Sequence, residues 1–414
     1  MARLFTVGAE ANQTGVGSAE NLILDGSNWP SAIATSPRSG SYCYECYATA
    51  AYTGYAARFA SGSIARGYMR VAIYVRGYDD GGPPQNHLFA EPGGTRSRVG
   101  ITSTGKMALY YGGTLLSTGS VTLALNTWYV ILFQVYLAGA SSIQEAKLYD
   151  ATGTTLLETL TDTTSRTTAN LLYFGFSGGA WNSANKGCRY DDIAINDATG
   201  GSENGYPDPA GKVVHLNPVS NNSIGSWRTG AGGTTNLHDG VDNEPPLGNS
   251  SETATTNIRV IATDTLNYNC DLNSTDYTTG GVGAGDTISL VQPMARYGNH
   301  DVDPNLVFRQ QIVSNPTGSE TSSAAIGTTA HGTELDTDWV TQYGDVIYAP
   351  SVTKGTSPVH RVIGDFTSGA GISEQICVDY MAIIVEYVPA VSVTTGWLRG
   401  TELPVIQRQQ MVGY

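Results

Sequence analysis

The amino-acid sequence predicts an all-β protein built from two β-sandwich domains and an extended C-terminal arm. Three observations support this prediction. The composition is rich in turn and strand residues, with 50 glycines and 24 tyrosines against 14% charged residues. The apolar residues occur in short alternating runs, without the spacing of an amphipathic helix. At 414 residues, the chain is also longer than one hydrophobic core usually serves.

The first domain is predicted over residues 1–197, where strand-like runs alternate with Gly, Pro and Asn turns. In "GYMRVAIYVRGY", the aliphatic side chains of Met69, Val71, Ile73 and Val75 share one face, as expected of a sandwich strand. The run "NTWYVILFQVYL" is apolar on both faces and predicts a central strand. A hairpin in "KLYDATGTTLLETL", with its turn at 150–153, and a last strand in "RYDDIAIND" complete the domain.

A Gly, Pro and Asp-rich stretch at 198–211 predicts an interdomain linker, and the second domain follows at 212–390. Its predicted strands are "KVVHLNP", "NIRVIATD", "DTISLVQPMAR", "NLVFRQQIV" and "QICVDYMAIIVEYV". The last of these alternates between two largely apolar faces and predicts a core strand.

The last segment, 391–414, is predicted to be a docking arm. It carries four apolar side chains without an obvious partner strand: Trp397, Leu398, Ile406 and Met411. Exposed apolar residues in a terminal segment favour contact with another surface. We therefore expect these residues to make assembly contacts.

The first region resembles the concanavalin A-like, laminin-G-like jelly-roll domain. The features that match are its length, the "NTWYVILFQVYL" strand with the "KLYDATGTTL" hairpin after it, and the closing "YDDIAI" strand. The second region, in "KVVHLNPVSNNSIGSWRTG", "DGVDNEPPLGN" and "DTISLVQPMARYGNHDVDPNLVFRQQIVS", is similar to the module that follows such a domain in tailed-bacteriophage structural proteins.

This resemblance implies a non-enzymatic virion structural protein, such as an appendage, fibre or decoration component. Its expected partners are other virion proteins and further copies of itself, and its expected location is the virion, after synthesis in the cytoplasm of the host bacterium. One alternative is an adsorption protein that binds glycans of the host surface. A less favoured alternative is a glycan-cleaving enzyme.

No catalytic residues are predicted. Jelly-roll glycosidases of the concanavalin class carry paired carboxylates on one strand face, in the pattern Glu-x-Asp-x-x-Glu, and this chain lacks that pattern. The nearest pair, Asp191 and Asp192, occupies adjacent strand positions that point to opposite faces. We expect these two carboxylates to bind turn amides at the edge of the sandwich.

Two loops could bind a ligand. Trp181 lies beside Asn182 and Asn185, and an aromatic face with adjacent amides suits a sugar ring. The alternative is that Trp181 covers the core. Asp79 and Asp80 offer oxygen ligands for Ca²⁺, with a solvated turn as the alternative. No other metal and no cofactor is predicted.

Cys43 and Cys46 have the spacing of a metal or redox motif. However, they lie in the alternating stretch "SYCYECYATA", and residues three apart in a strand point to opposite faces. Cys188, Cys270 and Cys377 have no Cys or His neighbour in the sequence that would complete a zinc site. We therefore expect Cys43 and Cys46 to be two half-buried strand residues, without a metal or redox function.

The formal net charge of −14 disfavours binding to nucleic acid, because a polyanion repels an acidic surface. The most apolar run, "WYVILFQVYLAGA", is too short to cross a bilayer. We expect no membrane insertion, and the first residues have no apolar stretch long enough for a signal peptide.

Overall fold

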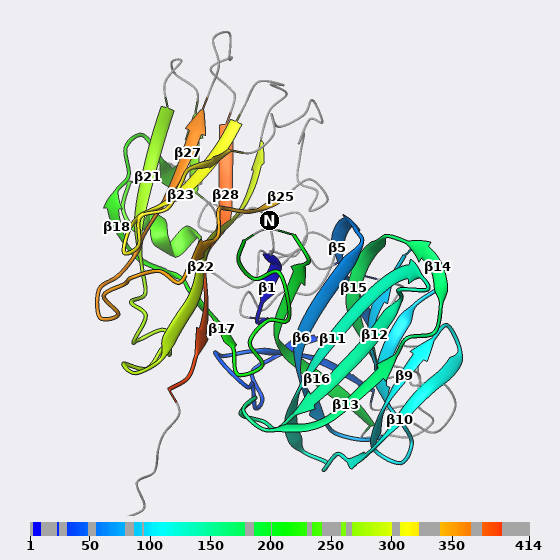
Figure 1. Cartoon of the computed structure of the whole chain (residues 1–414). Coiled ribbons are helices and arrows are strands. Elements are labelled where there is room, and N and C mark those ends of the chain that lie inside the picture. Colours follow the sequence, from blue (N-terminus) through cyan, green and yellow to red (C-terminus); the bar gives the residue numbers. More distant parts are fainter. Residues whose placement is uncertain are drawn as a thin grey trace, which may run out of the picture.

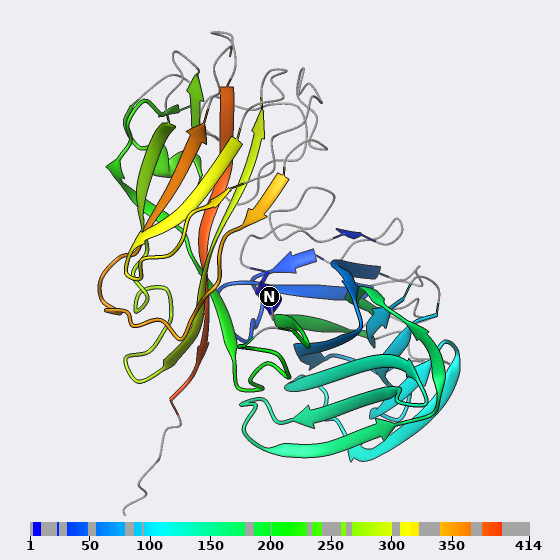
Figure 2. The same cartoon turned by 45° about the horizontal axis from the view of Figure 1, so that its top comes forward.

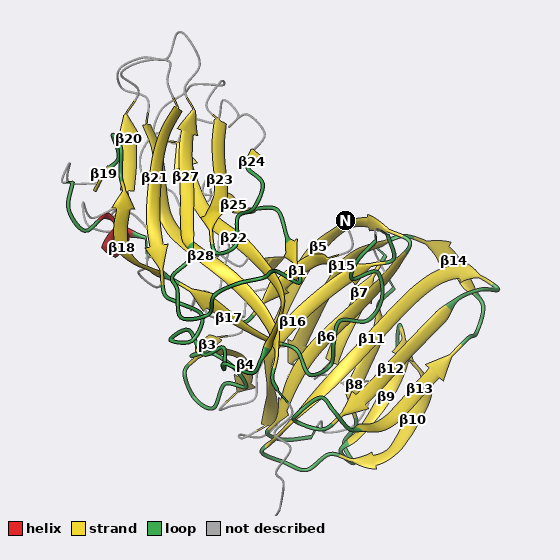
Figure 3. Cartoon of the chain, turned by 60° about the vertical axis from the view of Figure 1, so that its left-hand side comes forward, coloured by secondary structure: helices red, strands yellow, loops and turns green. Residues whose placement is uncertain are grey.

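In the computed structural model, the chain is described over residues 3–9, 23–24, 31–48, 55–78, 87–92, 95–178, 186–199, 201–229, 234–241, 258–261, 267–299, 307–322, 340–365 and 375–390. Within these residues the strands form four sheets, and the helical structure is one short 3₁₀ turn, η1 (Leu237–Gly240). The prediction of an all-β fold is therefore confirmed (Figure 3). The predicted docking arm lies outside the described residues.

Residues 3–197 form the first sandwich. Its nine-stranded sheet has the order β13-β12-β11-β6-β16-β4-β3, with β1 paired to β16 and β14 to β11. The strands are β1 (Arg3–Val7), β3 (Ser31–Ile33), β4 (Cys43–Ala48), β6 (Arg66–Val75), β11 (Thr127–Gly139), β12 (Ile143–Tyr149), β13 (Leu156–Asp162), β14 (Arg166–Ala169) and β16 (Lys186–Asp197).

The second sheet of this sandwich has the order β10-β9-β8-β7-β15-β5-β2. Its strands are β2 (Ile23–Leu24), β5 (Tyr55–Ile64), β7 (His87–Glu91), β8 (Ser97–Ile101), β9 (Lys106–Tyr111), β10 (Thr114–Thr122) and β15 (Leu171–Gly178).

The core of the first sandwich follows the alternation seen in the sequence. Met69, Val71, Ile73 and Val75 of β6 point into one apolar cluster between the sheets, as predicted. β11 is paired on both sides, with β12 and β6, and both of its faces are largely buried. The predicted hairpin joins β12 to β13, where the Asp150 N–H donates to the Thr155 carbonyl at 3.1 Å.

Residues 212–388 form the second sandwich from two further sheets, with the orders β19-β20-β28-β22-β25 and β18-β21-β27-β23-β24; β17 also pairs with β28 and β26 with β22. The strands are β17 (Lys212–Leu216), β18 (Pro218–Ser223), β19 (Arg228–Thr229), β20 (Ile258–Ile261), β21 (Asn267–Ser274), β22 (Thr287–Asn299), β23 (Val307–Ser314), β24 (Thr321–Ser322), β25 (Val340–Tyr343), β26 (Ile347–Tyr348), β27 (Val359–Asp365) and β28 (Gln375–Val388).

β28 is the core strand that the sequence predicted. Its inner face contributes Val378, Ile383 and Val385 to the interior of the second sandwich. Its other face carries Ala382 and Ile384, which pack in a separate apolar cluster with Val213, Met294 and Tyr380. Both faces are buried because this second face belongs to the side of the sheet that meets the first sandwich.

The two sandwiches lie side by side, with β1 between them (Figures 1 and 2). A buried charge cluster joins them. The Glu386 carboxylate on β28 accepts hydrogen bonds from the guanidiniums of Arg3 on β1 and Arg70 on β6. All three side chains are at most 1% exposed. Burial by itself raises the pKa of the Glu386 carboxyl, but the two guanidiniums outweigh it and hold that pKa below its ordinary value.

A second set of polar contacts lies beside this cluster. The Asp192 carboxylate on β16 accepts from the Arg38 guanidinium at 2.6 Å and from the Val213 N–H at 2.7 Å. The Ser39 hydroxyl donates to the Val213 carbonyl at 2.9 Å. Because Val213 lies on β17 of the second sandwich, one carboxylate contacts strands of both sandwiches.

The segment predicted as a linker contains no strand in its described part, 198–199 and 201–211. It packs on the outer face of the nine-stranded sheet. The Tyr206 ring lies edge-on to Tyr68, with ring centroids 5.1 Å apart, and the Tyr206 hydroxyl donates to Glu145 Oε1 at 2.9 Å. The segment therefore covers part of the outer face of the first sandwich before the chain enters β17.

Candidate functional site

The ligand and assembly residues predicted from sequence lie outside the described residues. This holds for the predicted sugar loop, the predicted calcium loop and the apolar side chains of the docking arm: Trp181, Asn182, Asn185, Asp79, Asp80, Trp397, Leu398, Ile406 and Met411. These sites therefore stay predictions. Within the described ranges, no group of three or more His, Cys, Asp or Glu residues is placed to hold a metal ion.

The Cys43–Cys46 pair lies on strand β4, and neither residue forms a disulfide. Both side chains are fully buried, so the prediction of half-buried residues was wrong about the degree of burial. Cys46 belongs to the core cluster of the first sandwich, whereas the Cys43 thiol lies 3.8 Å from the Ile33 and Thr35 carbonyls. The two sulfurs thus have different surroundings, as strand alternation predicted. Burial also raises the pKa of the Cys46 thiol well above its ordinary value.

The prediction for Asp191 and Asp192 was right about their contacts and wrong about their directions. The Asp191 carboxylate accepts from the backbone N–H groups of Arg38 and Ser39, at 2.8 and 3.2 Å. Asp192 bonds the side chains of the same two residues. The two carboxylates converge because Asp192 has φ +51° and the pairing of β16 with β6 slips between Asp191 and Ala194.

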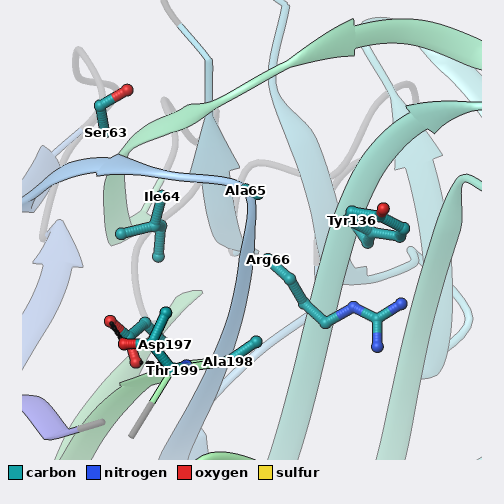
Figure 4. Close-up of a pocket in the computed structure, with 8 residues that line it drawn as sticks. All are labelled: Ser63, Ile64, Ala65, Arg66, Tyr136, Asp197, Ala198 and Thr199. Atoms are coloured by element: carbon teal, nitrogen blue, oxygen red, sulfur yellow. Dashed lines mark hydrogen bonds between the residues drawn. The ribbon is translucent and has the colours of Figure 1, made fainter. Parts of the chain in front are cut away.

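A pocket of about 490 Å³ opens where β6 begins (Figure 4). Strand register assembles it. Arg66 on β6 lies directly opposite Tyr136 on β11, and Gly67, the next residue, lies opposite Asp197 on β16. The turn from β5 into β6 supplies one wall, and the residues after β16 supply another. The lining residues are Ser63, Ile64, Ala65, Arg66, Tyr136, Asp197, Ala198 and Thr199.

Arg66 is the cation of this pocket. Its guanidinium carbon lies 4.3 Å from the centre of the Tyr136 ring, a cation–π distance. Among the described residues Arg66 makes no ion pair or hydrogen bond, and its Nε is buried without an acceptor. An unsatisfied buried donor costs roughly 1–3 kcal/mol. In the part of the chain that the structure describes, the arginines that form ion pairs are Arg3, Arg38, Arg70, Arg76, Arg96, Arg166, Arg189, Arg296, Arg309 and Arg361.

Asp197 is the carboxylate of the pocket. Its side chain accepts the Thr199 N–H and the Thr199 hydroxyl, each at 2.8 Å. These two contacts fix the carboxylate at the end of β16 and leave oxygen lone pairs for further donors. Figure 4 shows the Arg66 guanidinium directed toward Tyr136 and away from Asp197. The Ser63 hydroxyl, which accepts from Asn170 Nδ2 at 2.9 Å, keeps its own proton to donate.

This arrangement offers several kinds of group that can bind a small polar ligand. It offers a cationic donor, an aromatic ring, a hydroxyl and an acceptor carboxylate in a volume typical of small-ligand sites. Glycoside hydrolysis needs two carboxyl groups across the scissile bond, and the lining residues include one.

A larger groove of about 890 Å³ lies between the two sandwiches. The groove offers few charged groups to a ligand. The Arg3 guanidinium already forms ion pairs with Glu386 and Glu203, and the other lining residues are mostly uncharged. The Arg3 N–H faces the Tyr348 hydroxyl at 3.3 Å, and the Phe5 and Tyr343 rings meet edge-on at 6.2 Å. We therefore interpret this groove as part of the contact between the two sandwiches.

Sequence reasoning did not find Arg66, Tyr136 or Asp197. The three come from strands β6, β11 and β16, and no motif links them. Strand alternation does place Arg66 on the same face as Arg70, four residues further along β6, but which residues flank it depends on the register of both neighbouring strands.

No protein-family model matches the chain, and no curated protein matches it. Solved structures match part of it. The PL-14 alginate lyase from Aplysia kurodai is 14% identical over 40% of this chain and 86% of its own, with a TM-score of 0.34. The basic winged bean lectin is 13% identical over 45% and 95%, with a TM-score of 0.33.

The alginate lyase vAL-1 from Chlorella virus is 8% identical, over 43% of this chain and 94% of its own, with a TM-score of 0.34. At these values the similarities decide neither fold nor activity. Among the described residues there is also no helix of the length and hydropathy needed to span a bilayer.

Proposed function

We propose that this chain is a non-enzymatic structural protein of a tailed-bacteriophage virion, acting by assembly and surface display. The sequence resemblance suggests the class, and one structural observation supports it: Arg3, Arg70 and Glu386 lock the two sandwiches together through a buried ion-pair cluster. Two domains fixed in this way form a rigid spacer with wide outer surfaces. Other virion proteins and further copies of the chain are the proposed partners.

The test of this proposal is the protein content of purified particles of the phage that encodes the chain. We expect its peptides in mass spectrometry at a stoichiometry of several copies per particle, and antibody labelling at one defined position on the virion. Particles that contain no such peptides, while a known capsid protein is detected as the control, would exclude the structural role.

A second candidate function is glycan binding, compatible with the first. The pocket formed by Arg66, Tyr136 and Asp197 favours it, because sugars bind through an aromatic ring flanked by polar side chains. On an array of bacterial surface glycans we expect binding by the wild-type chain and weakened binding by Tyr136→Ala. The predicted Trp181 loop is the competing site, so Trp181→Ala is the matched variant. Absence of all binding would exclude the function.

The non-enzymatic part of the proposal needs its own measurement. Incubation with host polysaccharide should release neither new reducing ends nor the unsaturated sugars that a lyase produces. A commercial polysaccharide lyase serves as the positive control, and any release that depends on the wild-type chain would contradict the proposal.

A further inference from the structure

Taking glycan binding at the Arg66 pocket as its basis, the geometry points to an acidic saccharide as the ligand: a sugar that carries a carboxylate or sulfate group. The first observation is the state of Arg66. Its guanidinium stacks on Tyr136, its buried Nε lacks an acceptor, and no described carboxylate pairs with it. The buried Nε is closed to a ligand, but the terminal Nη groups are not among the buried unsatisfied atoms and can donate to an acid group on the ligand in the geometry that guanidinium prefers.

The second observation is the position of Asp197. It lines the same pocket and forms no ion pair with Arg66. Two hydrogen bonds from Thr199 hold its carboxylate in place. A negative side chain repels a simple anion but accepts hydrogen bonds from hydroxyl groups. The pocket therefore has a cationic end and an acceptor end, separated as Figure 4 shows.

The third observation is the size of the pocket. About 490 Å³ exceeds the space that a lone sulfate or phosphate fills. A sugar ring with an acid group at one end and hydroxyl groups at the other matches the volume and both ends. The exposed Ser63 hydroxyl at the rim can donate to a ring or glycosidic oxygen.

The experiment is calorimetric titration of the full-length chain with oligogalacturonate and oligoglucuronate, each beside its neutral methyl ester, and with a sulfated galactan fragment beside its desulfated form. We expect an acidic member to bind at least about tenfold more tightly than its neutral partner, because a charge-assisted hydrogen bond is lost in the neutral form. The pair that shows this difference tells carboxylate from sulfate.

The variant Arg66→Met keeps the aliphatic stem and should reduce the affinity for the acidic form to that of the neutral form. Arg76→Met is the matched control, because Arg76 follows the other end of β6 and is bound to Glu45 at 2.8 Å. It should leave the affinity unchanged. Because the acid and ester comparison uses the wild-type chain, the test does not depend on the folding of a variant.

Each failure has a distinct meaning. Neutral and acidic forms that bind equally would overturn the acidic preference and leave glycan binding in place. No binding of any saccharide would overturn both. Inorganic sulfate that displaces the sugar at equal concentration would show a simple anion site, which also overturns the inference.

Discussion

The two sandwiches share antiparallel architecture but differ in their interiors. In the first, side chains from both sheets form a single apolar cluster that includes Phe59, Phe133 and Phe176. In the second, the apolar interior is divided into two clusters, one around Trp227 and one around Tyr277. The second sandwich also buries two histidines, His215 and His360.

Burial lowers the pKa of His215 and of His360 to about 3, so both rings are neutral at pH 7. The first sandwich buries no histidine among the side chains that the structure describes. An apolar interior stabilises a sandwich in a way that is almost independent of pH, whereas buried imidazoles link folding to protonation. The comparison therefore predicts two halves of similar architecture with different responses to acid.

The largest loss of stability is expected from a substitution that removes the ion pairs between the two sandwiches. Glu386→Ala leaves the buried guanidiniums of Arg3 and Arg70 without their shared carboxylate. Removing one partner from a buried charge cluster costs about 3–5 kcal/mol, so the urea midpoint should fall strongly.

The control for this variant is Glu203→Ala. The Glu203 side chain is 25% exposed, and Arg3 keeps Glu386 when it is removed. We expect a loss below about 1 kcal/mol. Equal losses in the two variants would show that the charge cluster does not hold the sandwiches together.

Acid should destabilise the second sandwich first. The unfolded chain takes up protons on His215 and His360 below their ordinary pKa of 6.5, whereas the folded chain does so near pH 3. The stability from the neutral rings is therefore complete above pH 6.5 and is lost as the pH falls. Between pH 6 and pH 5 the two rings together should cost roughly 2–3 kcal/mol.

Hydrogen exchange with mass spectrometry, repeated from pH 7 to pH 4.5 with correction for intrinsic rates, separates the two halves. Peptides of β21, β23 and β27 should lose protection before those of β6 and β11. His360→Met should reduce the effect by about half, because one of two linked protons is removed. Simultaneous loss of protection in both sandwiches would refute this difference.

A smaller effect concerns the segment that connects the halves. Gly153, in the β12–β13 turn, has φ +77°, and a Cβ there would lie 2.1 Å from the Pro209 carbonyl oxygen. Gly153→Ala should therefore cost about 1–3 kcal/mol and displace the 201–211 segment from the hairpin. Gly113→Ala is the control, because a Cβ at Gly113 would meet no atom within 4 Å. Thermal unfolding that ranks the two variants equally would contradict this contact.

The smallest effect sharpens the contrast between buried and exposed charge. Arg76 pairs with Glu45 at 2.8 Å, but its side chain is 25% exposed and Glu45 keeps Arg189 as a second partner. We expect Arg76→Ala to cost less than about 1 kcal/mol. A double-mutant cycle with Glu45→Ala measures the pair, and a coupling as large as the loss in Glu386→Ala would contradict the expectation.

Sequence patterns located only part of the strands that carry the cores. β6, β11 and β28 were found because their apolar alternation or density is local information. β7, β8, β9, β15, β21 and β27 were not among the predicted strands. In β21, "NYNCDLNS", Cys270 and Leu272 are the apolar residues that reach the core, and polar residues separate them. Such a strand is held by its pairing with β18 and β27 more than by its own composition.

The candidate site shows the limit of the same reasoning. The predicted ligand residues were chosen from loops, since an aromatic beside amides or two adjacent acids can be recognised within a short stretch. Arg66, Tyr136 and Asp197 become neighbours through the registers of two strand pairs. A shift of one residue in either pair would move a side chain to the other face of the sheet.

The sequence by itself therefore determined the all-β class, the alternating core faces and the separation of the two cysteine sulfurs, because each depends on residues within a few positions of one another. Only the tertiary structure decided which charges meet. Glu386 contacts Arg3 and Arg70, each more than three hundred residues away in the sequence. Arg66 lies against Tyr136 and has no ion-pair partner among the residues that the structure describes. The physical reason is that ion pairs and pockets depend on distances in space, which long-range strand pairing sets.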